Sequence, residues 1–542
     1  MNLKSTLAEM AQLLASDDDD FPIDAGEMLR EIIGGELDAA PIILDLLAGE
    51  GARKRRRDNV IGALIQMLGI AAEQLRFRLD EQRADALAAF EKVKAIIGEA
   101  TNAGRIDAGA MVLIGRAFWR ANLDLGPTLR GAMAAQADAS PPPGPRAPAN
   151  GAGGAKAEIE EVLREIVAQS GGDPFAIYAF ASEMTNALPD AARVRFVSAL
   201  AQSRSAPIRD ASVGFLLDAD AEVCASAAYG LSAVGANAVS QQSLNRMVLM
   251  RNWLDQPRRD TLDGALRAAR SGAPAVKSSA LQQTRFMSMS TVDGAGALSV
   301  YVGFKEKTGV GLASVLIKDG FGVRDAFVLR NRKKREMDEM LAGMDPQLEF
   351  FPTTRESIIM LIGHALATNL AIAAPPPFGL AQVVEMAGLG IIAPEHISTA
   401  RLVADLISAI PDAEAGNAAI ARALQHSSYW PEISGIPDSW FEDNDSVDTL
   451  LTGKPRRQHT TLLLEQLLPQ RRVIWADKMA WSALALRQEQ DNALGREMAL
   501  VARELLGERD LKSIPIMRWI ADATADAYAA RRSARGRRSG RA

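Results

Sequence analysis

Residues 206–272 carry short amphipathic helical patterns at nearly constant spacing, and this regularity constrains the fold more than any other feature of the chain. In its clearest unit, an Asp-rich turn ending at Asp220 precedes an apolar stripe, and Gly235 follows it. The stripe recurs at steps of three and four residues, at Val223, Ala227, Leu231 and Val234. These steps place the four side chains on one face of a helix that begins at Asp220 and ends at Gly235.

This unit resembles a HEAT-type helical repeat, and the resemblance covers about residues 206–272 only. Helices are also predicted to begin near Asp173, Pro189 and Pro207, at intervals of roughly 15 to 20 residues, which lies in or just below the range of such repeats. The resemblance implies helices that stack to bury one continuous core, and a surface that binds other proteins rather than an active site.

Proline and glycine mark the clearest domain boundary, because Ser140–Gly154 is too rich in both residues to form a helix or a central strand. We therefore expect a mainly α fold with a small inserted β meander. The predicted order is a helical domain (1–134), a linker (135–157), HEAT-like helical repeats (158–290), a β meander plus a helix (291–345), a helical C-terminal region (346–530) and a basic disordered tail (531–542).

The meander is predicted where the apolar period changes from that of a helix to that of a strand. Residues 298–304 alternate between apolar and other side chains, and two further strands are expected at 310–318 and 323–329, giving a three-stranded antiparallel meander. Such a meander is marginal alone, so it must pack on helices. We expect the face of Leu298, Val300, Val302 and Phe304 to be buried, with Tyr301 and the lysines pointing outward.

Composition indicates an ordinary globular protein. The 542 residues carry a formal net charge of −6, which is too small to draw the whole chain to nucleic acid. Cys224 is the one cysteine, so no intrachain disulfide forms, and we expect its thiol to be a buried, unreactive group. The N-terminus lacks the features of a signal peptide, and the apolar stretch 358–374 is predicted to be a buried core helix. We expect a cytoplasmic protein without a membrane partner; the abundance of alanine and arginine is typical of a bacterial source.

No motif in the chain predicts catalytic, cofactor-binding or metal-binding residues. The four histidines, His364, His396, His426 and His459, do not have the spacing of metal ligands on one helix, and nucleotide-binding and hydrolase signatures are absent. The sequence therefore predicts no cofactor and favours a protein that is not an enzyme. A pocket that brings one of these histidines close to carboxylates would support an enzyme without a recognisable motif.

The strongest candidate binding surface is a set of basic residues in the meander and the helix after it. Basic side chains with aromatic neighbours on a sheet are typical of nucleic-acid or phosphate binding. The alternative is that these residues protect a strand edge and solvate a helix start. The candidate residues are Lys305, Lys307, Lys318, Arg324, Arg332, Lys333, Lys334 and Arg335.

A second basic run, Arg53–Arg57, is compatible with a phosphate-binding patch or a nuclear address, and the alternative that we favour is a solvated helix start. For the whole chain we predict a non-enzymatic helical-repeat scaffold or adaptor that binds protein partners. The first alternative is a protein that associates with nucleic acid through the basic meander and the Arg-rich tail. The second alternative is an enzyme without a recognisable motif.

Overall fold

The computed structural model describes residues 3–15, 29–30, 32–33, 36–81, 83–126, 129, 131, 163–185, 188–270, 284–342, 349–433, 438–488 and 493–539. The chain forms two compact units, Met1–Ser212 and Val213–Ala542. The division between them falls inside the segment predicted as one repeat domain (158–290), and the predicted linker (135–157) lies outside the described residues.

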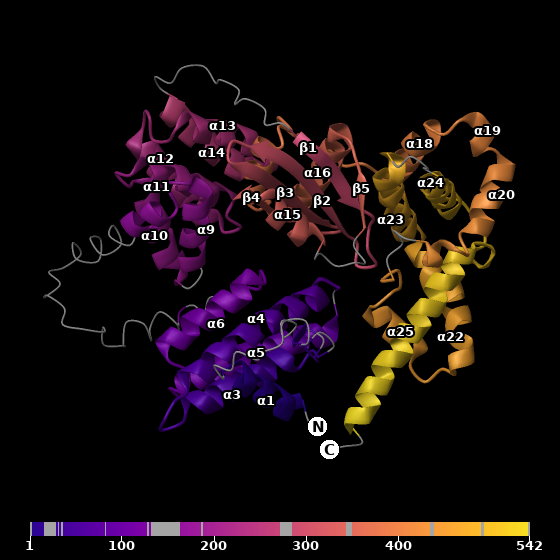
Figure 1. Cartoon of the computed structure of the whole chain (residues 1–542), viewed down its shortest axis with the longest axis horizontal. Helices are drawn as coiled ribbons and strands as arrows, with labels where there is room; N and C mark the ends of the chain where they lie inside the picture. The colour runs from indigo at the N-terminus through magenta and orange to yellow at the C-terminus, as the bar shows by residue number, and fades with distance from the viewer. Residues whose placement is uncertain are drawn as a thin grey trace, which may run out of the picture. The chain divides into compact units, whose positions relative to one another are not determined.

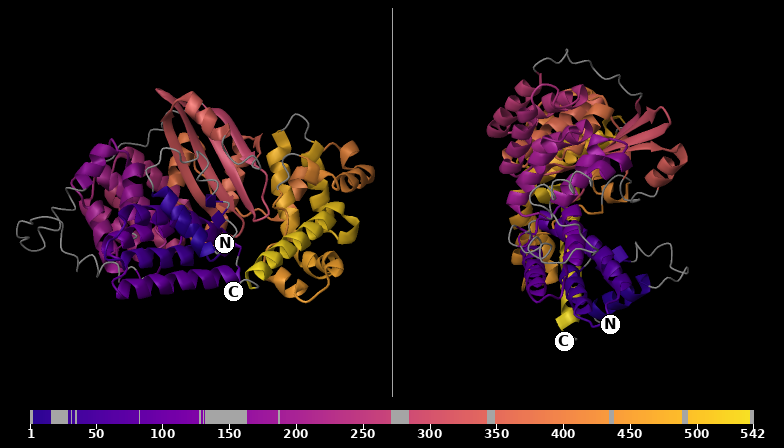
Figure 2. Two further views of the ribbon diagram at one scale, coloured as in Figure 1. Left: turned by 60° about the horizontal axis from the view of Figure 1, so that its bottom comes forward. Right: turned by 90° about the vertical axis from the view of Figure 1, so that its left-hand side faces the viewer.

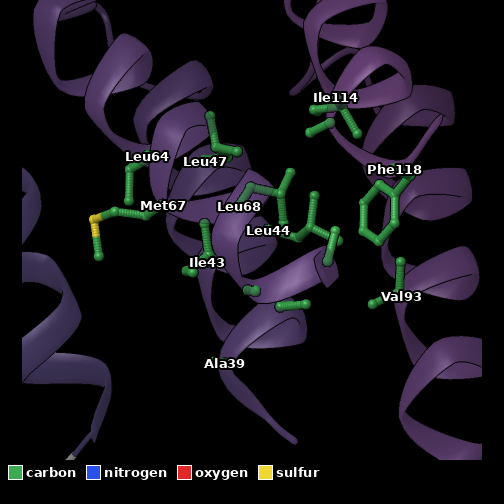
Figure 3. Close-up of a cluster of buried hydrophobic side chains, with 14 of the residues drawn as sticks. Ala39, Ile43, Leu44, Leu47, Leu64, Met67, Leu68, Val93, Ile114 and Phe118 are labelled. Atoms are coloured by element: carbon green, nitrogen blue, oxygen red, sulfur yellow. The ribbon is translucent and has the colours of Figure 1, made fainter. Parts of the chain in front are cut away.

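The first unit is helical. Its helices are α1 (Leu3–Leu14), α3 (Ala39–Gly51), α4 (Asp58–Asp80), α5 (Ala84–Asn102), α6 (Ala108–Arg120), α9 (Pro174–Thr185), α10 (Asp190–Ala201) and α11 (Ala206–Ser212) (Figure 1). Apolar side chains of α3 and α4 face each other in the core, among them Ile43, Leu47 and Leu68 (Figure 3). Asp107 begins α6 by accepting a hydrogen bond from the backbone N–H of Ala110 (2.8 Å).

Among the described helices, α4 alone is long and apolar enough to cross a membrane by length and composition. Half of its most apolar window is buried inside the structure. Its buried residues, such as Leu64, Met67 and Leu68, belong to the core of the first unit. This burial is also what the central helix of a helical domain shows.

The second unit opens with the segment that carries the sequence regularity. It contains η1 (Val213–Leu217), α12 (Ala221–Val234), α13 (Gln241–Met250), η2 (Arg251–Trp253) and α14 (Gln256–Arg270). Asp220 begins α12 as predicted, because its carboxylate accepts the N–H of Glu222 (2.9 Å), and Gly235 ends it with a φ of 77°. Val223, Ala227 and Leu231 are buried, whereas Val234 is 39% exposed. The predicted buried stripe is therefore one residue too long.

An antiparallel sheet follows the helices. Its strands are β1 (Thr284–Ser290), β2 (Ala297–Glu306), β3 (Gly309–Lys318), β4 (Gly322–Arg332) and β5 (Phe350–Pro352), in the order β4-β3-β2-β1-β5. The predicted meander corresponds to β2, β3 and β4, but the prediction of three strands is wrong, since the sheet has five. The strand β5 is three residues long, and β1 alternates between apolar and polar residues only over Met287–Ser290.

Two glycines let aromatic rings lie flat on the sheet. The ring of Phe286 covers Gly303 and that of Phe304 covers Gly311, and a Cβ at either glycine would lie 2.2 Å from the ring. The strands lie side by side in both views of Figure 2. Side chains at these two positions would push the rings off the sheet.

Helices cover both faces of the sheet. On one face lie α16 (Arg355–Ala371) and α17 (Gly379–Met386), and α15 (Lys334–Ala342) contacts the sheet through β3. Helix α16 buries Ile358, Leu361 and Leu366, which confirms the predicted core helix. The buried face of the meander is confirmed too: Leu298, Val300, Val302 and Phe304 are each at most 3% exposed.

The rest of the second unit is helical: α18 (Thr399–Ser408), α19 (Asp412–Ala415), α20 (Asn417–His426), η3 (Trp430–Glu432), α21 (Asp445–Leu451), α22 (Arg456–Leu462), a π-helical turn (Leu463–Leu467), η5 (Leu468–Arg471), α23 (Arg472–Ala485), η6 (Leu486–Gln488), α24 (Ala493–Leu506), η7 (Leu511–Ser513) and α25 (Pro515–Ser539). Helix α25 lies beside α22 (Figure 1). It continues through residues 531–539, where the sequence predicted a disordered tail. Arg531 explains part of this difference, because it forms ion pairs with Asp443 and Asp448.

Candidate functional site

The outer face of the sheet is the face opposite α16 and α17. Tyr301 lies on this face. It was predicted to point outward into solvent, but it is buried, with 8% of its surface exposed. Its ring meets that of Phe350 edge to face at 4.6 Å, and it belongs to a small core with Leu312 and Met337. The prediction for Tyr301 is wrong because α15 and β5 cover this part of the sheet.

Six of the eight candidate basic residues lie near one end of the sheet. Lys305 and Lys307 stand at the turn between β2 and β3, and both are exposed. The pairing of Val310 with Arg332 brings the end of β4 beside that turn. Lys333, Lys334 and Arg335 continue from it into α15. We call these six residues, Lys305, Lys307 and Arg332–Arg335, the basic end of the sheet.

The other two candidates, Lys318 and Arg324, lie at the opposite end. Lys318 closes β3 and is 5% exposed, and Arg324 follows on β4. Their charged groups lie 5.7 and 5.1 Å from the ring centre of Phe321. A strand of ten residues spans about 30 Å, so the eight candidates do not form one continuous surface.

Carboxylates neutralise part of the basic end. Lys333 is paired with Glu336 (3.6 Å) and Arg335 with Glu339 (2.7 Å), while the adjacent Arg330 is paired with Glu306 (2.9 Å). The Lys333 and Arg335 pairs are exposed, and exposed pairs contribute at most about 1 kcal/mol each. No ion-pair partner among the described residues is found for the remaining four, Lys305, Lys307, Arg332 and Lys334. The basic end therefore keeps a moderate positive charge.

An apolar groove lies beside these charges, between β4 and α15. It has a volume of about 330 Å³ and is lined by Leu329, Arg332, Glu336, Met337 and Met340. Met340 is 38% exposed, and Phe327, two residues before Leu329 on the same face of β4, is 42% exposed. Flexible methionines and an exposed aromatic ring adapt well to the surface of a partner.

Strand β4 is an edge of the sheet, and its first half is covered. The Asn369 side chain accepts the N–H of Val323 (2.8 Å) and donates to the carbonyl of Phe321 (3.1 Å). The carbonyl oxygen of Ala326 points away from β3 and lies close to Gly379. A Cβ added at Gly379 would be 1.8 Å from that oxygen. Backbone groups of an antiparallel edge strand point outward at every second residue, so those of Val328 do as well. No hydrogen-bond partner of the Val328 N–H and carbonyl groups is found in the part of the chain that the structure describes.

The second basic run, Arg53–Arg57, is held by local carboxylates. Glu50 is 4% exposed and accepts two hydrogen bonds from Arg57 (2.7 and 2.8 Å) and forms an ion pair with Arg53 (3.1 Å). These guanidinium groups hold the pKa of Glu50 below its usual value. Arg56 is paired with Asp107. The run immediately precedes α4, as expected for a solvated helix start.

The four histidines lie in two kinds of environment. His426 contacts Glu497 (2.9 Å) and His459 contacts the Lys454 carbonyl (3.0 Å), whereas His364 and His396 stack on each other with ring centres 5.2 Å apart. His364 lines a pocket together with Asp319 and Asp477. A histidine close to carboxylates in a pocket is the arrangement that would support the second alternative, an enzyme without a recognisable motif. The sequence did not predict which residues form it, because they come from separate elements and share no local motif. Among the described residues, no group of three or more His, Cys, Asp or Glu side chains is placed to hold a metal ion.

Two regions of the chain match family models. Residues 189–272 match the Y4lR second domain, and residues 400–529 match the Y4lR C-terminal helical domain. The sheet, with its basic end and groove, lies between these two regions in the sequence. Neither matching model is one of a HEAT repeat, so the HEAT-type resemblance stays a prediction.

A similar protein is the uncharacterized protein y4lR of Sinorhizobium fredii (strain NBRC 101917 / NGR234). The two are 25% identical over 374 residues, which cover 68% of this chain and 71% of that protein. No solved structure matches the chain. The chain is thus similar to Y4lR, most clearly in the second and the C-terminal helical domains of that family.

Proposed function

We propose that this protein is a non-enzymatic adaptor that binds a protein partner through the groove between β4 and α15. The groove itself is the observation that carries the proposal: about 330 Å³ lined by Leu329, Met337 and Met340. Phe327 and Met340 are large apolar side chains that remain over a third exposed next to it. Burying such side chains supplies most of the affinity of protein interfaces.

The charges around the groove define the partner further. Arg332 lines the groove, and Lys305, Lys307 and Lys334 of the basic end lie near it without ion-pair partners among the described residues. The partner segment therefore carries an apolar anchor for the groove and acidic residues beside it. Complementary charge raises the association rate and selects among partners, whereas the anchor sets the lifetime of the complex.

The helices of the second unit support the interpretation as a scaffold. Helix α12 packs on α14 and on η1, and it is bounded by the Asp220 cap and by Gly235. We propose on this basis that η1 and α12–α14 form a HEAT-like stack. Such a stack presents binding elements rigidly, which reduces the entropy lost on binding.

The nucleic-acid alternative receives less support from the described residues. A continuous basic surface would be expected to neutralise several phosphates at once. Two of the eight candidate residues lie at the far end of the sheet, and two of the other six are paired with carboxylates. Arg531, at the start of the basic tail, is also held by acidic side chains.

The adaptor proposal is tested by a charge placed in the groove. Met340→Glu should abolish capture of the partner from the native cell, because it puts a carboxylate where an apolar anchor and acidic flanks would bind. Met184→Glu is the matched control, since Met184 on α9 is 36% exposed and lies in the other unit. The measurement is affinity capture with quantitative mass spectrometry, on variants whose circular dichroism matches the wild type.

A protein captured by the wild type and by Met184→Glu, but not by Met340→Glu, supports the proposal. A photoreactive residue at position 340 should then form a crosslink with that same protein. The proposal fails if Met340→Glu captures the same set of proteins in the same amounts as the wild type.

A further inference from the structure

A second site lies on the other side of the sheet, at the ends of β2 and β3 where they meet α16 and α23. A pocket of about 40 Å³ opens there. Its polar lining comes from Asp319 after β3, His364 on α16 and Asp477 on α23, and Trp481 forms an aromatic wall. The volume admits a group of a few non-hydrogen atoms.

Two buried lysines, Lys318 and Lys478, also line this pocket, and both interact with charged groups of the protein. Lys478 is 7% exposed; its ammonium group donates to the Gly294 carbonyl and lies 4.3 Å from the ring centre of Trp475. Burial lowers the pKa of Lys478, and the charges of Glu442 and Asp293 oppose that effect. The charge of Arg471, which is paired with Glu442 (3.1 Å), adds to the lowering. Asp293 also interacts with the charge of Lys318. These lysines are therefore committed to the buried charge network.

Two carboxylates, those of Asp319 and Asp477, line the same pocket. Asp319 is exposed, and among the described residues no hydrogen bond or ion pair of its carboxylate is found. Asp477 accepts a hydrogen bond from the Thr399 hydroxyl (2.8 Å). Burial, and then the nearby Asp319 charge, raise the pKa of Asp477 to about 6. A positive group bound between the two carboxylates would relieve this repulsion.

The aromatic walls suit a positive group as well. The Nδ1 atom of His364 accepts the backbone N–H of Ile397 (3.1 Å), so the neutral ring carries its proton on Nε2. Burial and then the charge of the neighbouring His396 lower the pKa of His364, which favours the uncharged ring. The ring centres of Trp481 and His364 lie 5.0 Å apart. The electron-rich face of an indole attracts cations.

We propose that this pocket binds the ammonium group of a small organic amine, held between Asp319 and Asp477 against Trp481. A primary ammonium offers three N–H donors to two carboxylates, and its short alkyl chain suits the apolar part of the lining, Leu298, Ile317 and Leu361. A metal ion is a poorer match, since no group of three ligands is placed for one among the described residues. This site is separate from the groove, and the adaptor function does not depend on it.

The test uses the full chain and the amine n-propylamine, with 1-propanol as the uncharged ligand of similar size. Ligand-detected NMR at pH 7.5 should show saturation transfer to millimolar n-propylamine and little to 1-propanol. Asp319→Asn should weaken amine binding by about tenfold or more, because it removes one charge-assisted contact at an exposed position. Asp477→Asn should do the same. Asp338→Asn, an exposed change on α15, is the control and should leave binding unchanged.

The proposal is overturned if n-propylamine shows no saturation transfer, if 1-propanol binds equally well, or if Asp319→Asn binds the amine as the wild type does. Asp319 is exposed, so its substitution is not expected to unfold the protein, and the test stands even if Asp477→Asn misfolds. Loss of partner capture in Met340→Glu with intact amine binding would separate the two sites.

Discussion

At Asp477, the folded structure opposes ionisation of the carboxyl group, and this makes stability depend on pH. Its pKa is about 6 in the folded protein, against about 4 in an unfolded chain. Between these values the folded state holds a proton that the unfolded state has released. The free energy of unfolding therefore falls as the pH rises from about 4 to about 6, and this contribution is constant above that range.

Asp477→Asn removes this titration but keeps an acceptor for the Thr399 hydroxyl. We expect the variant to gain stability relative to the wild type as the pH rises from about 4 to about 6, and to keep that gain at higher pH. Urea denaturation at several pH values measures the difference. A difference between the two proteins that does not change with pH would show that the Asp477 carboxyl titrates normally.

The local sequence around a residue decides whether its place in the site could be predicted. Cys224 was predicted to be a buried thiol, and it is 1% exposed with its pKa raised by burial to about 11. That prediction needed only the helical pattern around the residue. Asp319, His364 and Asp477 have no such pattern, because 158 positions separate the first from the last and only the fold brings them together.

Among the elements, helix α12 gives the sharpest test of packing. Leu231 is 1% exposed, so Leu231→Asp would bury an unpaired carboxylate. We expect it to destabilise the protein by several kcal/mol. Glu222→Ala, on the exposed side of the same helix, should change the free energy of unfolding by less than about 0.5 kcal/mol. Thermal and urea denaturation measure both. Equal, small effects would mean that α12 does not pack as the structure shows.

The strands show which elements a pattern can predict. Alternation over residues 298–304 identified β2, and apolar runs at 310–318 and 323–329 identified β3 and β4. The three residues of β5 are too few for any period to be recognised. Tyr301 was placed on the correct face, opposite Val300 and Val302, but that face was assumed to be in solvent. The assumption failed because Met337 of α15 packs over it, which depends on a tertiary contact.

For the whole molecule, the order of helical region, sheet and helical region could be predicted, because it depends on changes of period along the chain. The division into two compact units at Ser212 could not be, since it depends on which helices contact each other. The predicted linker stays a prediction. We expect brief proteolysis to cut first between about Ala134 and Ala157, apart from the C-terminal tail, as identified by mass spectrometry of the fragments. Early cleavage within 163–270 instead would contradict this boundary.

The short open stretch of β4 has a consequence for self-association. It lies between Ala326 and Asn331. Gly379 covers the carbonyl of Ala326, and Asn331 has a φ of 52° next to a register shift in the ladder with β3. Two copies that met along this edge would gain about two backbone hydrogen bonds, each contributing about 1 kcal/mol net. Association costs at least about 4 kcal/mol in lost motional freedom. The chain can therefore leave this part of the sheet edge open without forming a stable dimer through backbone hydrogen bonds along it.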